Sequence, residues 1–74
     1  MTPRQPVVSG AGLVRALERD GWTVVRQRGS HVRLKKTNRR NALVVPLHRE
    51  LRRGTLAGIL RDAGLSADEL RKLL

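Results

Sequence analysis

Hydrophobic residues recur at helical spacing in three segments of the chain. The first segment covers about residues 10–20 and follows Ser9, a favourable N-cap residue. The second covers residues 53–64, where apolar positions follow the i, i+3, i+4, i+7 pattern of an amphipathic helix. After it, Ser66 and Glu69 have the spacing of a capping box. We therefore expect two main helices and a short third helix at the C-terminal end of the sequence.

Between the first two helices the pattern changes to alternation and to short runs of β-forming residues. Residues 22–29 (WTVVRQRG) and 31–36 (HVRLKK) predict two strands joined by a tight turn. Residues 42–47 (ALVVPL) predict a third strand after the polar turn TNRRN. Pro46 belongs at an edge or a strand end, because proline cannot donate to a ladder of hydrogen bonds. A three-stranded meander in the order 1-2-3 accommodates all of these features.

The second strand shows which face of the sheet is buried. Successive side chains of a strand point to opposite faces, so Val32 and Leu34 face the core if the alternate residues face water. These alternate residues are His31, Arg33 and Lys35. The α-β-β-β-α order, with a short extra C-terminal helix, predicts an α+β fold in which helices cover one face of a three-stranded antiparallel sheet. The other face is expected to be open and basic.

The length and composition are consistent with one small domain. The chain has 74 residues, and we expect an N-terminal leader over residues 1–8 and a single domain over residues 9–74. It has no cysteine, which excludes a disulfide framework and thiolate metal sites. It shows neither the apolar region of a secretory signal nor a membrane-spanning segment. We therefore expect a cytoplasmic protein with no membrane partner, and its oligomeric state stays open.

The charge of the chain indicates a polyanionic partner. Sixteen Lys and Arg residues against six Asp and Glu residues give a formal net charge of +10, which favours nucleic acid. Membrane binding is less favoured, because no basic amphipathic helix carries Trp or Phe on its apolar face. Trp22 is the only aromatic residue, so recognition should depend on the nucleic-acid backbone and shape rather than on stacked bases. The candidate phosphate-binding residues, in a stretch without carboxylates, are Arg26, Arg28, Arg33, Lys35, Lys36, Arg39 and Arg40.

The two histidines are the candidates for proton transfer. His31 lies among these cations and follows Gly29 and Ser30, and histidine can exchange a proton near neutral pH. His48 follows the third predicted strand, where an ordinary surface role is the common alternative. Two histidines and scattered carboxylates show no metal-site spacing, so we expect no metal or other cofactor. Phosphodiester chemistry would then depend on proton transfer and fixed positive charge.

Thr55 is a further candidate for phosphate binding. With Gly54 it falls in the first turn of the second predicted helix, where free N–H groups attract phosphate. Local capping by the threonine explains the same residues, and both interpretations stay open.

Four motifs in this order resemble the HicA family of bacterial toxin mRNA interferases. They are GW at residues 21–22, RQRGSH ending at His31, VVPLH ending at His48, and RRGTLAGILRDAGL ending at Leu65, and the resemblance spans roughly residues 9–74. It implies a fold like the double-stranded-RNA-binding domain, a ribonuclease activity that arrests translation, and a HicB-type antitoxin partner. It also implies that His31 is catalytic and that His48 matches a histidine frequent in the family. Arg53 departs from the family pattern, in which Pro or Lys commonly precedes the Gly-Thr pair.

The chemistry of RNA is compatible with this resemblance. RNA carries its own nucleophile, the 2′-hydroxyl, so a metal-free site needs a base and cations around the phosphate. His31 would be the base, with Arg28, Arg33 and Lys35 binding the phosphate, and His48 is the candidate general acid.

Two other functions stay open at this point. A non-catalytic module that binds double-stranded RNA would share the fold and the charge. A DNA-binding helix-turn-helix could be formed by ILRDAGLSADELRKLL. Its recognition helix would open with Asp68 and Glu69, which places negative charge toward DNA, so this alternative ranks last.

Overall fold

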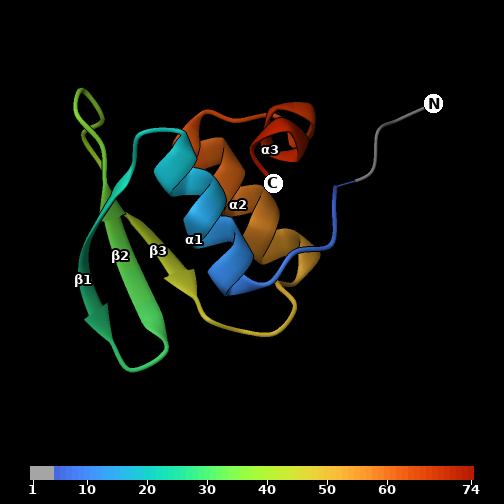
Figure 1. Cartoon of the computed structure of the whole chain (residues 1–74), viewed down its shortest axis with the longest axis horizontal. Helices are drawn as coiled ribbons and strands as arrows, with labels where there is room; N and C mark the ends of the chain where they lie inside the picture. Colours follow the sequence, from blue (N-terminus) through green and yellow to red (C-terminus); the bar gives the residue numbers. More distant parts are fainter. Residues whose placement is uncertain (1–4) are drawn as a thin grey trace.

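The computed structural model describes residues 5–74, so residues 1–4 of the expected leader lie outside the described residues. The elements in chain order are α1 (Gly10–Arg19), β1 (Thr23–Arg28), β2 (His31–Lys35), β3 (Leu43–Pro46), α2 (Arg53–Ala63) and α3 (Ala67–Leu73) (Figure 1). This order confirms the expected α+β fold of the double-stranded-RNA-binding-domain type, with the extra C-terminal helix. Each element lies close to its predicted boundaries.

The strands form one antiparallel sheet in the order β1-β2-β3, as the pattern predicted. Along β2, Val32 and Leu34 are buried, whereas the three alternate residues are exposed. Val32 lies opposite Val45 of β3, so the inner face of these two strands is continuous and apolar. The three alternate β2 residues therefore lie on the outer, solvated face of the sheet.

The helices lie on the inner face of the sheet, as expected, and β1 is the most exposed of the three strands. Both α1 and α2 contact β3, and β1 lies at the far side of the sheet from α2 (Figure 1). All six residues of β1 are exposed, including Val24, which lies opposite the buried Leu34. Helix α1 also contacts β1, so this strand lies at the margin of the helical layer, where its side chains remain exposed.

The core lies between the helices and the inner face of β2 and β3. Its largest fully buried side chains are Leu13, Leu17, Leu34, Leu70 and Val45. They come from α1, β2, β3 and α3, so the short third helix is part of the core. The helices and the sheet therefore share one hydrophobic core.

The first residue of α1, Gly10, lies in close contact with the backbone at the end of β3. The backbone N–H of Gly10 donates a hydrogen bond to the carbonyl of His48 at 2.9 Å. A Cβ atom at position 10 would clash with the carbonyl oxygen of Pro46. Glycine is therefore required there, and it brings α1 to the end of the sheet that also carries the β1–β2 turn.

The described part of the leader packs against the rest of the fold. Val8 is buried, and its carbonyl accepts a hydrogen bond from the backbone N–H of Leu51 at 2.9 Å. The side chain of Gln5 donates to the carbonyl of Arg53 at 3.3 Å. Residues 5–8 are thus tied to the segment that precedes α2.

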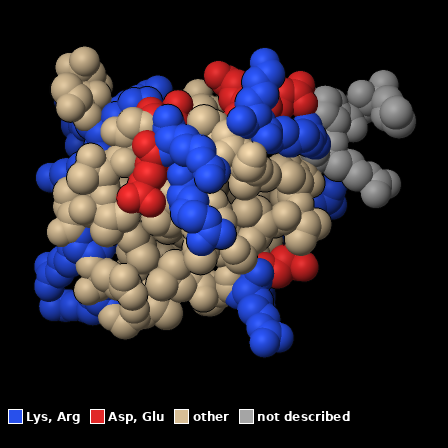
Figure 2. All heavy atoms as spheres, in the orientation of Figure 1, with Lys and Arg blue, Asp and Glu red and all other residues tan. Residues whose placement is uncertain are grey.

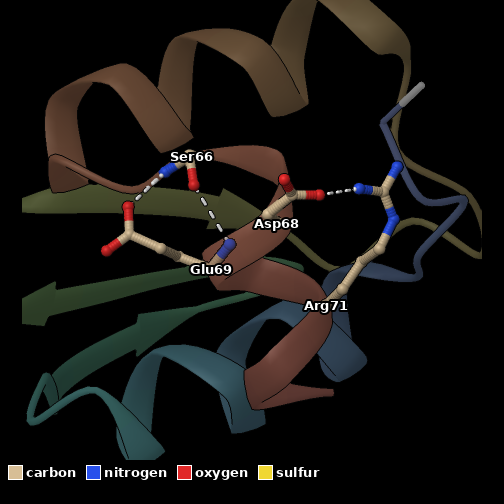
Figure 3. Close-up of polar contacts among 4 residues, drawn as sticks. All are labelled: Ser66, Asp68, Glu69 and Arg71. Carbon is tan, nitrogen blue, oxygen red and sulfur yellow. Dashed lines mark hydrogen bonds and ion pairs between the residues drawn. The ribbon is translucent and has the colours of Figure 1, made fainter. Parts of the chain in front are cut away.

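The third helix is held by the expected capping box (Figure 3). The Ser66 hydroxyl accepts from the Glu69 backbone N–H at 3.0 Å, and the Glu69 carboxylate accepts from the Ser66 N–H at 2.9 Å. Arg71 donates to Asp68 at 2.6 Å. Both acidic side chains thus have local partners at the start of the helix.

No helix within residues 5–74 is long and apolar enough to cross a bilayer.

Candidate active site on the sheet

His31 is the first residue of β2 and occupies the middle of a row across the sheet. The turn before it consists of Gly29 and Ser30, and Gly29 has a φ of 57°. Glycine at the first position of a two-residue turn suits a type II′ hairpin, which closes the strands without a longer loop. Arg28 of β1 therefore lies directly opposite His31, and Pro46 of β3 lies opposite it on the other side.

A second row on the same face completes a small basic pocket. Arg26, Arg33 and Val44 lie opposite one another across the three strands. Residues two apart on a strand share a face, so these side chains are neighbours of the His31 row. Together Arg26, Arg28, His31, Arg33 and Val44 line a pocket of about 160 Å³ on the outer face of the sheet. The structure thus brings together four residues that the sequence had singled out.

The charge of this pocket is not neutralised by neighbouring carboxylates. The ion pairs within residues 5–74 join Lys36 to Asp20, Arg61 to Asp62 and Arg71 to Asp68, and none involves a pocket arginine. Figure 2 shows Lys and Arg side chains along the margin of the molecule formed by the β1–β2 hairpin. The pocket is therefore suited to an anion, because its three guanidinium groups have no competing partner among the described residues.

The remaining cations of the hairpin lie at the opposite end of β2. Lys35 is on the outer face, but it lies four positions along the strand from His31, a distance of about 13 Å. Lys36 forms a half-buried ion pair with Asp20 at 3.1 Å. The guanidinium of Arg39 lies against Gly64, where α2 ends, and Arg40 is exposed in the same turn region. These residues are close to the pocket in sequence but distant from it in the fold.

His48 and Ser30 lie near the His31 end of the sheet. The Ser30 carbonyl accepts from the backbone N–H of Leu47 at 2.6 Å, which continues the pairing of β2 with the chain just beyond β3. His48 is exposed, its carbonyl is bound by α1, and it is not among the residues that line the pocket. The two histidines therefore share one end of the molecule without sharing the pocket.

The start of α2 adds cations that sequence reasoning did not select. Arg52 is the N-cap residue and makes no side-chain capping bond, and the exposed Thr55 lies in the first turn, as predicted. The segment between β3 and α2 lies at the same end of the molecule as the β1–β2 turn (Figure 1). Arg49, Arg52 and Arg53 are exposed there. Their signal in the sequence is the run HRELRR, in which three of six residues are arginine.

Comparison with known proteins is informative over most of the chain. The family model described as the HicA toxin of bacterial toxin-antitoxin matches residues 10–65. The chain belongs to the HicA toxin family. A solved structure described as a toxin-antitoxin complex from Streptococcus pneumoniae is similar, with 32% sequence identity and a TM-score of 0.68. The match covers 78% of this chain and 98% of that chain. No curated protein matches.

The region that matches the HicA family model contains the whole pocket. The matched region begins at the first residue of α1 and ends just after Gly64, so it contains every pocket residue and both histidines. The third helix lies beyond it. Within residues 5–74, no group of three or more histidine or acidic side chains is arranged to hold a metal ion. The pocket around His31 therefore lies entirely within the region that matches the family.

Proposed function

We propose that the protein is an endoribonuclease toxin that cleaves mRNA with His31 as its general base. The observation that carries the proposal is the pocket itself: an exposed histidine among Arg26, Arg28 and Arg33, none of which is paired with a described carboxylate. Membership of the HicA toxin family supports the same function. A pocket that only bound phosphate would need no histidine at its centre.

The proposed reaction uses the nucleophile that RNA provides. His31 takes the proton of a ribose 2′-hydroxyl, and the oxygen attacks the adjacent phosphorus. The pocket arginines stabilise the negative charge that grows on the phosphoryl oxygens. His48 is the candidate that gives a proton to the leaving 5′ oxygen. The first step yields a 2′,3′-cyclic phosphate and a 5′-hydroxyl, without attack by water.

The rest of the basic surface would hold the RNA strand on either side of the pocket. Ser30 and Lys35 lie on or beside the outer face, and Thr55 lies at the start of α2. The cations of the β2–β3 turn region, Lys36, Arg39 and Arg40, would contact phosphates farther from the cleaved bond. Two of them also make contacts within the fold, so we expect Arg40 to be the most available to RNA.

A HicB-type antitoxin is the proposed protein partner. The similar solved structure is a toxin-antitoxin complex, which supports an antitoxin for this chain as well. The pocket is positive and open, so an inhibitor that presents carboxylates to the outer sheet face would be complementary to it and would bind rapidly.

The decisive experiment is to map the RNA ends produced by the purified protein in EDTA. We expect 2′,3′-cyclic phosphate and 5′-hydroxyl ends by mass spectrometry. A substrate with a single deoxyribose on the 5′ side of the cleaved bond should bind but resist cleavage, because phosphate contacts dominate binding. Ends with a 5′-phosphate, a strict requirement for Mg²⁺, or cutting at the deoxy position would each contradict the mechanism.

The alternative function is a non-catalytic module that binds double-stranded RNA, which the fold class favours. It predicts firm binding of RNA that stays intact under the same conditions. Comparing the amount of bound RNA with the amount of cleaved RNA in one titration distinguishes the two functions.

A further inference from the structure

The outer edge of β1 is free and exposed on both faces. β1 ends the sheet order β1-β2-β3, and each of its six residues is exposed. Within residues 5–74, no other strand pairs with its second edge. The other end strand differs, because Leu43 and Val45 of β3 are buried and α2 packs on it. A free edge presents backbone N–H and carbonyl groups that a further strand can bind.

Two exposed apolar side chains lie on the same strand. Val24 is 38% exposed and Val25 is 51% exposed, and the register shifts between Val24 and Arg26 as in a β-bulge. Exposed valines on an edge strand provide an apolar contact for an added strand, in addition to backbone hydrogen bonds. The edge is thus equipped for pairing with protein, because RNA has no peptide groups to continue the sheet.

The charges of β1 determine which strand can bind. Arg26 and Arg28 alternate along β1 on the outer face. If two copies of the chain paired through β1, these arginines would face the same arginines of the other copy, and like charges across strands destabilise pairing. Carboxylates at alternate positions of an added strand would instead lie beside Arg26 and Arg28.

We propose that β1 is the docking edge for an extended acidic segment of the antitoxin, which adds to the sheet as a fourth strand. The proposal rests on the antitoxin partner inferred above. Arg26 and Arg28 also line the pocket around His31. The added strand therefore neutralises two of the three pocket arginines from the side, and it weakens phosphate binding without entering the pocket.

A synthetic peptide in which glutamate and valine alternate can test this edge on the full chain. We expect the peptide to slow hydrogen exchange of β1 backbone amides about tenfold or more, as measured by NMR, and to leave β3 unchanged. The control is the same peptide methylated on alternate backbone nitrogens, which keeps its charge and side chains but blocks strand pairing. It should bind about tenfold more weakly.

Two matched double variants distinguish binding of the peptide at β1 from nonspecific electrostatic attraction between the acidic peptide and the basic protein. Arg26→Gln with Arg28→Gln should weaken binding of the parent peptide about fivefold, since each cross-strand charge pair contributes modestly. Arg49→Gln with Arg52→Gln removes the same charge from another surface and should leave binding nearly unchanged. Equal weakening in both variants would show nonspecific attraction and overturn the proposal.

Three further outcomes would overturn it. Equal binding of the parent and methylated peptides would exclude strand addition. Protection of β1 amides that rises with protein concentration alone would identify a second copy as the occupant. An RNA oligonucleotide that protects the same amides equally would identify RNA. None of these measurements depends on RNA cleavage. The peptide-binding result can therefore be interpreted even if His31 is not the general base.

Discussion

His31 owes its position to its immediate neighbours in the chain. The turn of Gly29 and Ser30 leaves Arg28 and His31 as the pair that closes the hairpin. The side chain of His31 is exposed and makes none of the hydrogen bonds observed between described side chains. Its removal should therefore affect chemistry much more than stability.

We predict that His31→Ala lowers the rate of RNA cleavage by about 10²–10⁴-fold, the usual contribution of a general base. Unfolding by denaturant should be nearly unchanged, and the fluorescence of Trp22, which is 2% exposed, can follow it. The fold must be intact for the comparison to be valid. A folded His31→Ala protein that cleaves at the wild-type rate would remove the catalytic assignment.

His48 can be tested by changing the leaving group of the substrate. If it donates a proton to the 5′ oxygen, His48→Ala should slow cleavage of an RNA dinucleotide. A uridine 3′-phosphate ester with p-nitrophenol should then be cleaved at a rate close to wild type, because nitrophenolate leaves without a proton. His31→Ala should be slow on both substrates. If His48→Ala slows cleavage of the two substrates equally, His48 acts in binding or folding instead.

At the scale of elements, the contact between α1 and β3 sets the geometry of the end of the molecule that carries His31. Gly10 meets the backbone of Pro46, and Pro46 is the residue opposite His31. A larger residue at position 10 must push the helix away from the sheet or shift the strand.

We predict that Gly10→Ala destabilises the fold by about 1–3 kcal/mol, the usual cost of overpacking a tight contact. Gly58→Ala in α2 is the matched control, since the nearest atom to its added Cβ is the tip of Arg61 at 3.9 Å. It should stabilise the fold by about 0.5–1 kcal/mol, because glycine is a poor helix former. Urea unfolding of both variants measures the difference. Equal changes in the free energy of unfolding of the two variants would contradict a tight contact between Gly10 and Pro46.

At the scale of the whole molecule, the candidate RNA-binding cations of the β1–β2 hairpin and the turn after it fall into two groups. The pocket arginines lie at the His31 end of the outer face, whereas Lys36, Arg39 and Arg40 lie at the far end of the hairpin. Lys36 is half-buried against Asp20, which ties the hairpin to the end of α1. The two groups should therefore contribute differently to binding and to cleavage.

We predict that Arg33→Ala and Arg40→Ala have separable effects. Arg40→Ala should weaken RNA binding and lower the slope of log affinity against log salt by about 0.7, the value for one phosphate contact to a single strand. Arg33→Ala should produce that change and also reduce kcat. Filter binding over a range of salt, together with single-turnover cleavage, measures both. A reduced kcat in Arg40→Ala, or an unchanged kcat in Arg33→Ala, would contradict this division.

The sequence by itself determined the elements and most of the pocket. The apolar periods, the caps at Ser9 and Ser66 and the glycine turns are local signals, and each was confirmed. Alternation along β2 placed His31 and Arg33 on the outer face, because a strand leaves only two directions for its side chains. A short hairpin turn then necessarily brought Arg28 beside them.

Only the tertiary structure decided which distant residues meet. Strand register put Val44 in the pocket and left Lys35, Lys36, Arg39 and Arg40 at the other end, although they are near His31 in sequence. The packing of α1 and α2 on β3 left β1 exposed on both faces. These features depend on how helices fit across a sheet, and that fit depends on contacts between residues far apart in the chain. A local pattern determines the direction of a side chain, but long-range packing determines its neighbours.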